Sequence, residues 1–224
     1  MRRAGSLMIA VLVGLLALWL LWVLRDALAP TPRLADLALR ELPNTGVSNP
    51  VTGVLLAYRA YDTLLELAVL LAALLGIWSL GAASPGFQPA GTVLRGMVEL
   101  VVPLLILTGG YLLWVGGHAP GGAFQAGALL GAAGVVLRLA GDARAGLPPV
   151  PVQRRLVVAG AATFVLVGLA TMAFGAGFLS YPHAWAKWLI LTIETAATLA
   201  IGVTLAAAYV GGKPVPRSGE DGPS

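Results

Sequence analysis

The chain has 224 residues, of which 58% are hydrophobic and only 11% are charged, and its formal net charge is +4. Soluble globular domains carry about 25% charged residues, so this composition indicates an integral membrane protein. No cysteine is present, which excludes disulfides and cysteine-ligated iron–sulfur clusters within the chain. The basic residues form no stripe with interleaved aromatics, and nucleic acid is therefore not an expected partner.

Six apolar stretches are separated by connectors rich in proline and glycine. A membrane-spanning helix needs about 20 mostly apolar residues. The fourth stretch is shorter and rich in glycine, and its Gly127-x-x-x-Gly131 spacing permits close helix approach. The sequence therefore predicts an all-α, polytopic membrane fold. The six expected transmembrane helices cover about residues 6–29, 54–80, 92–115, 123–139, 156–179 and 186–210.

The first stretch resembles a signal peptide, but its apolar run over residues 7–24 is longer than the usual core of about 7–15 residues. We expect a retained helix. Lys and Arg are more numerous on the side that holds both termini, and positive loops face the cytoplasm. We therefore expect a multi-pass protein of the bacterial inner (cytoplasmic) membrane with both termini cytoplasmic, ending in a disordered tail.

Three charges interrupt the second apolar stretch. Arg59, Asp62 and Glu66 are spaced i, i+3 and i+7, so they share one face of a continuous helix. Each ionised side chain inside a membrane costs roughly 2.5–3.5 kcal/mol on insertion scales, so this face must meet protein, water or its own charges. Asp62 is the nearer partner for Arg59, which leaves Glu66 over. Glu66 either takes part in proton or cation movement or only helps to fix the packing.

Glu194 lies about a third of the way into the last apolar stretch. An acid at this depth is a functional-site hypothesis by default. The alternative is a structural acid, hydrogen-bonded to Thr192, Thr195 or Thr198. Near the opposite membrane face, Glu99 follows Arg95 by four residues, and we expect these two to form a solvated pair.

A tight connector, Gly-Gly-His-Ala-Pro-Gly-Gly, joins the third and fourth stretches at residues 116–122. His118 either makes a structural hydrogen bond or serves as a proton-accessible imidazole. It has no second His or Cys at metal-ligand spacing, so no metal site is expected. No phosphate-binding loop and no serine nucleophile motif occurs. We therefore expect no cofactor, no catalytic residue and no enzymatic activity.

Two motifs resemble known families. The stretch from Asn49 to Glu66, NPVTGVLLAYRAYDTLLE, is similar to the N-x-V-T…RGxDTxxE motif of the E-type module of Mrp multisubunit cation/proton antiporters, which recurs in group 4 membrane-bound hydrogenases. The stretch GHAPGGAF, residues 117–124, is similar to the GHxxPGGGF signature of the antiporter B subunit, the MnhB domain. The resemblance implies a fused chain, with an E-type two-helix module at 1–85, an MnhB-like four-helix module at 86–212 and a tail at 213–224.

The resemblance further implies an accessory subunit of an Mrp-type Na⁺(K⁺)/H⁺ antiporter. Its partners would be large antiporter-like subunits and other small membrane subunits, the lipid bilayer, and Na⁺ or K⁺ together with H⁺. Asp62, Glu66 and Glu194 would belong to an ion path, with Arg59 as their charge partner. The matching motif turn comprises Gly117, His118, Pro120, Gly121, Gly122 and Phe124.

The chain departs from these patterns at three alanines. Ala60 and Ala123 replace glycines, and Ala119 alone separates His118 from Pro120 where the family has two residues. Alternatives therefore stay open: an ion-translocating subunit of a redox-driven complex-I-like or hydrogenase assembly, or a structural adaptor whose charges only fix assembly. A stand-alone transporter is disfavoured because no inverted repeat is visible.

Overall fold

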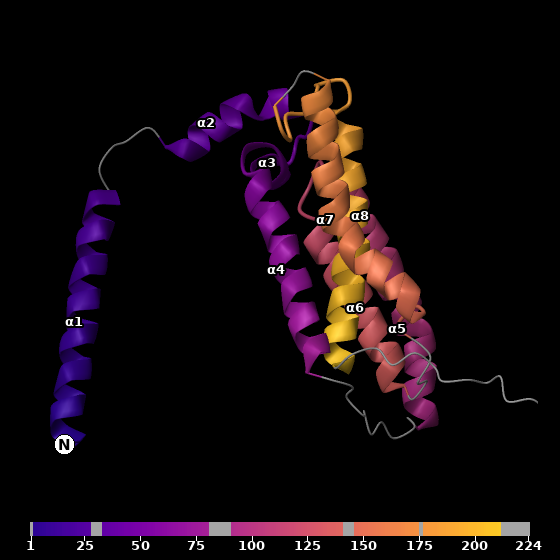
Figure 1. Cartoon of the computed structure of the whole chain (residues 1–224), viewed down its shortest axis with the longest axis horizontal. Helices are drawn as coiled ribbons and strands as arrows, with labels where there is room; N and C mark the ends of the chain where they lie inside the picture. Colours follow the sequence, from indigo (N-terminus) through magenta and orange to yellow (C-terminus); the bar gives the residue numbers. More distant parts are fainter. Residues whose placement is uncertain (1, 28–32, 81–90, 141–145, 175–176, 212–224) are drawn as a thin grey trace, which may run out of the picture. The chain divides into compact units, whose positions relative to one another are not determined.

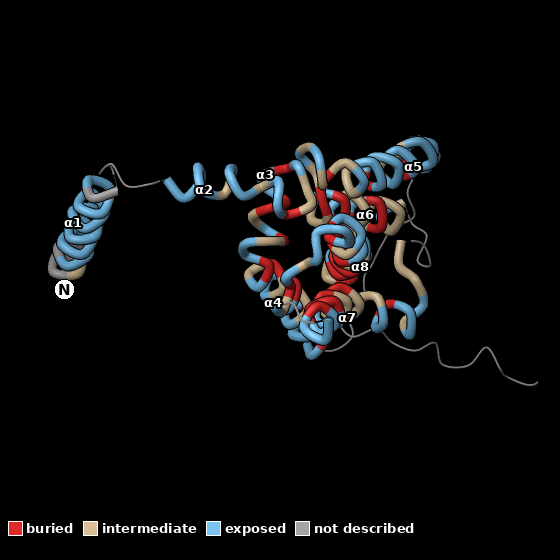
Figure 2. The backbone as a smooth tube through the Cα atoms, turned by 90° about the horizontal axis from the view of Figure 1, so that it is seen from above, coloured by how far each residue is buried: buried red, intermediate tan, exposed pale blue. Residues whose placement is uncertain are grey.

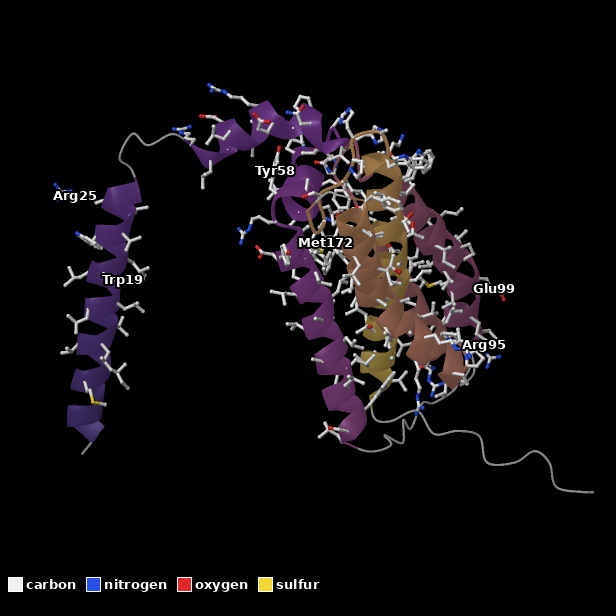
Figure 3. The ribbon with its side chains drawn as sticks, turned by 45° about the horizontal axis from the view of Figure 1, so that its top comes forward. Trp19, Arg25, Tyr58, Arg95, Glu99 and Met172 are labelled. Carbon is white, nitrogen blue, oxygen red and sulfur yellow. The ribbon has the colours of Figure 1, made fainter. Side chains whose placement is uncertain are left out.

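The computed structural model describes residues 2–27, 33–80, 91–140, 146–174 and 177–211, and within these ranges the regular structure is entirely helical. The chain forms two compact units, Met1–Leu37 and Ala38–Ser224. In the first unit, α1 (Arg2–Ala27) contains an apolar window, Met8–Arg25, with all of its side chains exposed. Trp19 and Arg25 project from this helix in Figure 3.

The second unit contains a helical bundle preceded by short helical turns (Figure 1). Helix α2 (Leu34–Glu41) begins in the first unit and ends in the second. The remaining elements are a 3₁₀ turn (Leu42–Thr45), α3 (Pro50–Gly53), a π-helical turn (Val54–Tyr58), α4 (Ala60–Ser79), α5 (Thr92–Val115), α6 (Ala123–Leu139), α7 (Val150–Ala173) and α8 (Ala186–Val210).

Among the described helices, α1, α4, α5, α7 and α8 are long and apolar enough to cross a membrane, and α6 is a shorter apolar helix. This confirms the predicted all-α, polytopic fold. The predicted bounds of α5, α6 and α8 agree with the structure. The connector at 81–90 and the tail at 213–224 lie outside the described residues, and the division into two family modules stays a prediction.

Helix α8 is the centre of the bundle. Figure 2 shows it in the middle of the second unit, where buried residues are drawn in red. It packs against α6, α7, α4 and α5. Its Ile190 and Ile193 are fully buried, together with Phe164 of α7 and Leu74 of α4. Because α8 is enclosed on several sides, the polar residues on its inner faces, among them Glu194, are buried.

The predicted close approach of the small-residue helix is confirmed. A Cβ added to Gly127 would lie 2.7 Å from the Cβ of Ile201, and one added to Gly131 would lie 2.9 Å from the Cβ of Leu205. Both targets belong to α8, so the glycines of α6 form its contact face. Small residues at such positions let helix backbones come close in a membrane.

Both expected bounds of the fifth helix are wrong. The fifth helix was expected at 156–179, but α7 runs from Val150 to Ala173. It begins early because Pro151 occupies its first turn, where the missing N–H costs no hydrogen bond. Beyond its end, Leu179 is buried with a φ of 59°, a left-handed conformation that no helix contains.

The expected pairing of Arg95 with Glu99 is also not found. Both side chains are exposed on α5, where Figure 3 labels them, and no ion pair joins them. The expected helix over 54–80 is divided at Arg59, a break that shapes the site described next.

Candidate functional site

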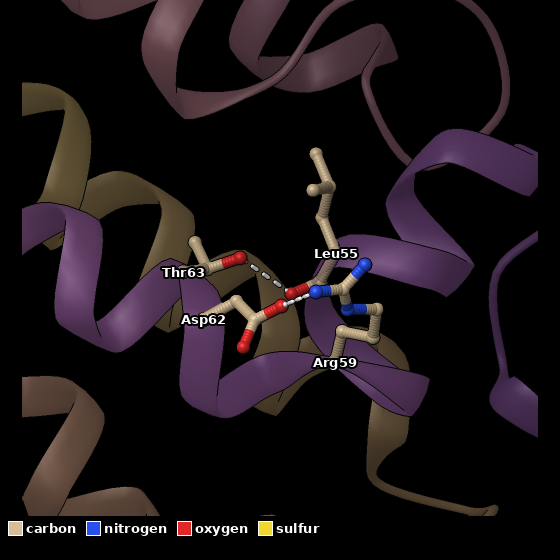
Figure 4. Close-up of polar contacts among 4 residues, drawn as sticks. All are labelled: Leu55, Arg59, Asp62 and Thr63. Atoms are coloured by element: carbon tan, nitrogen blue, oxygen red, sulfur yellow. Dashed lines mark hydrogen bonds and ion pairs between the residues drawn. The ribbon is translucent and has the colours of Figure 1, made fainter. Parts of the chain in front are cut away.

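The chain leaves helical geometry at Arg59, whose φ is −125° and ψ is 35°. Before it, the π-helical turn closes with a bond of 2.8 Å from the Arg59 N–H to the carbonyl of Val54, five residues back. The Thr63 hydroxyl donates to the Leu55 carbonyl at 2.6 Å and spans the break (Figure 4). Single π-turns inside helices are frequently found at functional sites.

Arg59 and Asp62 form the expected ion pair across this break, through Nη2 and Oδ2 (Figure 4). Their side chains are 70% and 46% exposed, so the pair lies on the surface of this chain. Glu66 is exposed one turn further along α4, and no hydrogen bond or ion pair to its carboxylate occurs in the described part of the chain. The prediction that Arg59 satisfies the nearer acid is therefore confirmed, and the role of Glu66 stays a prediction.

The segment that begins at Asn49 contacts the glycine-rich turn at residues 116–122. Asn49 is buried, and its side-chain amide donates to the carbonyls of Gly116 and Ala119, both at 2.8 Å. The Thr52 hydroxyl donates to the Gly116 carbonyl at 2.5 Å. The backbone N–H groups of Ser48 and Asn49 both donate to the carbonyl of Gly117 at 3.0 Å. The Asn-x-x-Thr segment thus holds the glycine-rich turn between α5 and α6 by satisfying its carbonyls.

At two positions of this turn, Gly121 and Gly122, a residue with a side chain would not fit. A Cβ on Gly121 would lie 2.5 Å from the carbonyl oxygen of Leu112. Gly122 has a φ of 112°, a region that residues with a Cβ rarely adopt, and its N–H donates to Leu112 O at 2.9 Å. A Cβ there would also lie 2.8 Å from Oε1 of Glu194. The turn therefore presents bare backbone to the acid of α8.

Glu194 is buried, with 5% of its surface exposed. The backbone N–H of Ala123, the first residue of α6, is in hydrogen-bonding position to its carboxylate. The proposed threonine partners are wrong: the hydroxyls of Thr192, Thr195 and Thr198 donate to backbone carbonyls four residues earlier in α8. The backbone N–H that faces the Glu194 carboxylate therefore comes from the start of α6, directly after the glycine-rich turn, and not from α8.

A pocket of about 360 Å³ lies beside Glu194. Its walls come from the connector at 43–48, from the motif turn and from the first turns of α8. The ionisable lining groups are His118, Lys187 and Glu194, and Trp114 lines the same space. The His118 side chain makes no hydrogen bond to the described residues, so the first of the two alternatives for it, a structural hydrogen bond, is not found.

Sequence reasoning missed Lys187. Its Nζ lies 6.0 Å from the ring centroid of Trp114 and 5.8 Å from that of Trp188, distances at which an ammonium is attracted to an aromatic face. Lys187 precedes Glu194 by seven residues, two helical turns, and this spacing was the available signal. Within the described ranges no cluster of His, Asp or Glu could hold a metal ion.

A protein-family model described as "Domain related to MnhB subunit of Na+/H+ antiporter" matches residues 93–211, just over half of the chain. The chain belongs to the MnhB family. Within this family, a protein of Staphylococcus haemolyticus named "Putative antiporter subunit mnhB2" is 30% identical over 100 residues, covering 44% of this chain and 71% of its own. The Staphylococcus aureus (strain Newman) protein of the same name is 34% identical over 95 residues, covering 42% and 67%.

Two solved structures resemble this MnhB-family chain. The Mrp complex from Dietzia sp. DQ12-45-1b contains a chain with a TM-score of 0.70 and 26% identity, and the match covers 99% of this chain and 27% of that one. This protein thus spans about a quarter of the length of the Dietzia chain. The membrane-bound sulfane sulfur reductase, an archaeal respiratory membrane complex, gives a TM-score of 0.69 and 25% identity over 89% of this chain and 96% of that one.

Proposed function

We propose that this MnhB-family protein is an accessory membrane subunit of an Mrp-type multisubunit Na⁺(K⁺)/H⁺ antiporter, and that it contributes part of an ion path. One observation carries the proposal: the family's motif turn encloses a buried carboxylate, Glu194, beside a pocket. The chain would move ions and catalyse no covalent chemistry. Any redox step would belong to other subunits.

In this proposal Glu194 takes up and releases a proton. The carboxylate is buried in α8, beside the N–H of Ala123 and at the wall of the pocket. The pocket supplies the route by which the proton reaches the carboxylate.

Glu66 would act at a different place, the outer surface of α4. An exposed carboxylate on an apolar helix is costly against lipid, so its surroundings must be water or another subunit. With Arg59 already paired to Asp62, Glu66 is available to such a neighbour. Other antiporter subunits are therefore the proposed partners, and Asp62 with Arg59 would adjust the local charge.

Helices of this length and composition make the chain a multi-pass membrane protein. We further propose the bacterial inner membrane and two cytoplasmic termini, from the distribution of Lys and Arg. The E-type module at 1–85 and the MnhB-like module at 86–212 would then share one chain. The Dietzia match supports this arrangement, since it covers 99% of this chain within a single longer one.

The test is Glu194→Gln in the assembled complex, which keeps the shape and removes the titratable group. Complexes reconstituted in vesicles should lose Na⁺-driven proton movement, followed with a pH-sensitive dye, while subunit recovery stays normal. Unchanged exchange would refute the role of Glu194. Weak recovery combined with normal exchange by the surviving complexes would instead favour the structural adaptor.

A second candidate is an ion-translocating subunit of a redox-driven assembly. The likeness to the archaeal respiratory complex favours it, because that match covers 96% of the other chain. Purification through a tag on this protein distinguishes the two. Antiporter-like subunits alone would support the antiporter, and co-purifying subunits with iron–sulfur clusters would support the redox-driven complex.

A further inference from the structure

We propose that the pocket beside Glu194 admits protons and excludes alkali cations, and that Lys187 is the residue that sets this selectivity. The inference rests on the proposed function and names the ion that uses this site. Three features of the described residues carry it: the small number of free oxygens in the lining, the Lys187 ammonium at the same pocket, and the room for water beside His118.

An alkali cation that leaves water needs several oxygen ligands to replace its hydration shell. From the motif turn only Gly117 and His118 line the pocket, and the Gly117 carbonyl already accepts hydrogen bonds from the N–H groups of Ser48 and Asn49. The side-chain oxygens left in the lining are those of Ser48 and Glu194. With so few protein oxygens, a cation there would keep much of its hydration shell, and its binding would depend on the net charge of the pocket.

Lys187 adds a positive charge to the same space. It lies two turns from Glu194 on α8, about 10 Å along the helix axis, and both side chains line the pocket. Its Nζ lies 6.0 Å from the ring centroid of Trp114 and 5.8 Å from that of Trp188. Lys187 is exposed, so solvent screens part of its repulsion, which weakens cation binding several-fold.

A proton meets neither obstacle. It needs no coordination shell, and it neutralises Glu194 on arrival. A volume of about 360 Å³ has room for roughly ten waters, which can form a hydrogen-bonded chain. His118 lines the pocket too, and its ring nitrogens can hydrogen-bond to such waters. Helices α4, α6 and α7 contribute no ionisable side chain to the lining, so Lys187 and His118 are the groups that face Glu194 there.

The test uses dicyclohexylcarbodiimide on the purified, assembled complex, with the Glu194 adduct measured by peptide mass spectrometry. This reagent modifies protonated carboxyl groups, and a bound cation protects them. Labelling is compared in NaCl, KCl and choline chloride at equal ionic strength. The native chain should label equally in all three salts. Lys187→Met should gain protection by Na⁺, with several-fold less adduct than in choline, whereas Lys187→Arg keeps the charge and should behave like the native chain.

Protection of native Glu194 by Na⁺ or K⁺ would overturn the inference, and so would a Lys187→Met complex that gains no protection. Absence of any adduct in choline at low pH would also overturn it, because protons would then not reach the site. If Lys187→Met does not assemble, Lys187→Gln replaces it. Labelling does not measure transport, so these outcomes are separate from the exchange assay of Glu194→Gln, whose failure would refute the proposed function itself.

Discussion

Gly122 and Glu194 lie so close that a Cβ on residue 122 would be 2.8 Å from Oε1 of the acid. The two residues belong to different parts of the chain, the turn before α6 and the buried centre of α8. Their contact joins the family's glycine-rich motif to the one carboxylate buried among the described residues. The motif is therefore understood as a wall of the Glu194 site.

Gly122→Ala should disturb this contact. The substitution forces a Cβ into a left-handed conformation, which costs about 1–3 kcal/mol, and also pushes against the carboxylate. We expect a lower unfolding temperature of the complex, measured by thermal aggregation of the tagged chain, and reduced exchange. Gly110→Ala is the control, because a Cβ on Gly110 meets nothing within 4 Å and alanine favours helices. Equal behaviour of the two variants would contradict the steric role of Gly122.

Asn49→Ala tests the link between the two motifs. It removes the donor to the Ala119 carbonyl and one of the donors to the Gly116 carbonyl. A buried acceptor left unsatisfied costs about 1–3 kcal/mol, so the thermal stability of the complex should fall. The matched control is Asn44→Ala, since the Asn44 amide donates to Glu41 at an exposed position and such changes stay within about 0.5 kcal/mol. Comparable loss in both variants would argue against the link.

Glu66→Gln separates an ion path from an adaptor role. If the carboxylate serves the path, exchange in vesicles should drop severely while recovery of the complex on detergent purification stays normal. If its charge only fixes assembly, recovery should fall and the surviving complexes should exchange normally. Glu99→Gln, at another exposed and unpaired carboxylate, serves as the control for removing a surface charge.

A double-mutant cycle of Arg59→Ala and Asp62→Ala should show weak coupling in stability. Both side chains are substantially exposed, and exposed ion pairs contribute about 0.2–1 kcal/mol. The cycle is measured from the unfolding temperatures of the four complexes. Coupling well above this range would mean that a neighbouring subunit encloses the pair in the assembly.

Hydropathy and helix breakers predicted most of the fold. Glycine and proline flank α5 and α6 closely, so their bounds followed from the residues alone. After α7 the sequence stays apolar as far as Leu179 and contains no proline. The end of this helix was therefore expected six residues later than Ala173, where α7 ends. The π-helical turn before Arg59 has no signal of its own, because its five residues are ordinary helix formers.

The site was predictable only in part. Depth in an apolar helix singled out Glu194, and spacing predicted the pair of Arg59 with Asp62. The hydrogen bonds of Asn49 with the turn join residues that are 67 and 70 positions apart in the sequence. No local sequence pattern predicts a contact between residues so far apart. Lys187 did have a local signal, its seven-residue spacing from Glu194, but its approach to Trp114 of α5 is a long-range contact of the same kind.

Gly127→Val tests whether helix packing positions the acid. Its side chain would meet the Cβ and Cγ2 of Ile201 at 2.7 Å, and overpacking of a tight interface costs typically about 1–3 kcal/mol. Helix α6 would have to move away from α8, which would carry the N–H of Ala123 away from Glu194. We expect lower thermal stability and weaker exchange in vesicles. Gly96→Ala on α5, where a Cβ meets nothing within 4 Å, should leave both unchanged, and a Gly127→Val complex with normal exchange would show that the Ala123 contact is dispensable.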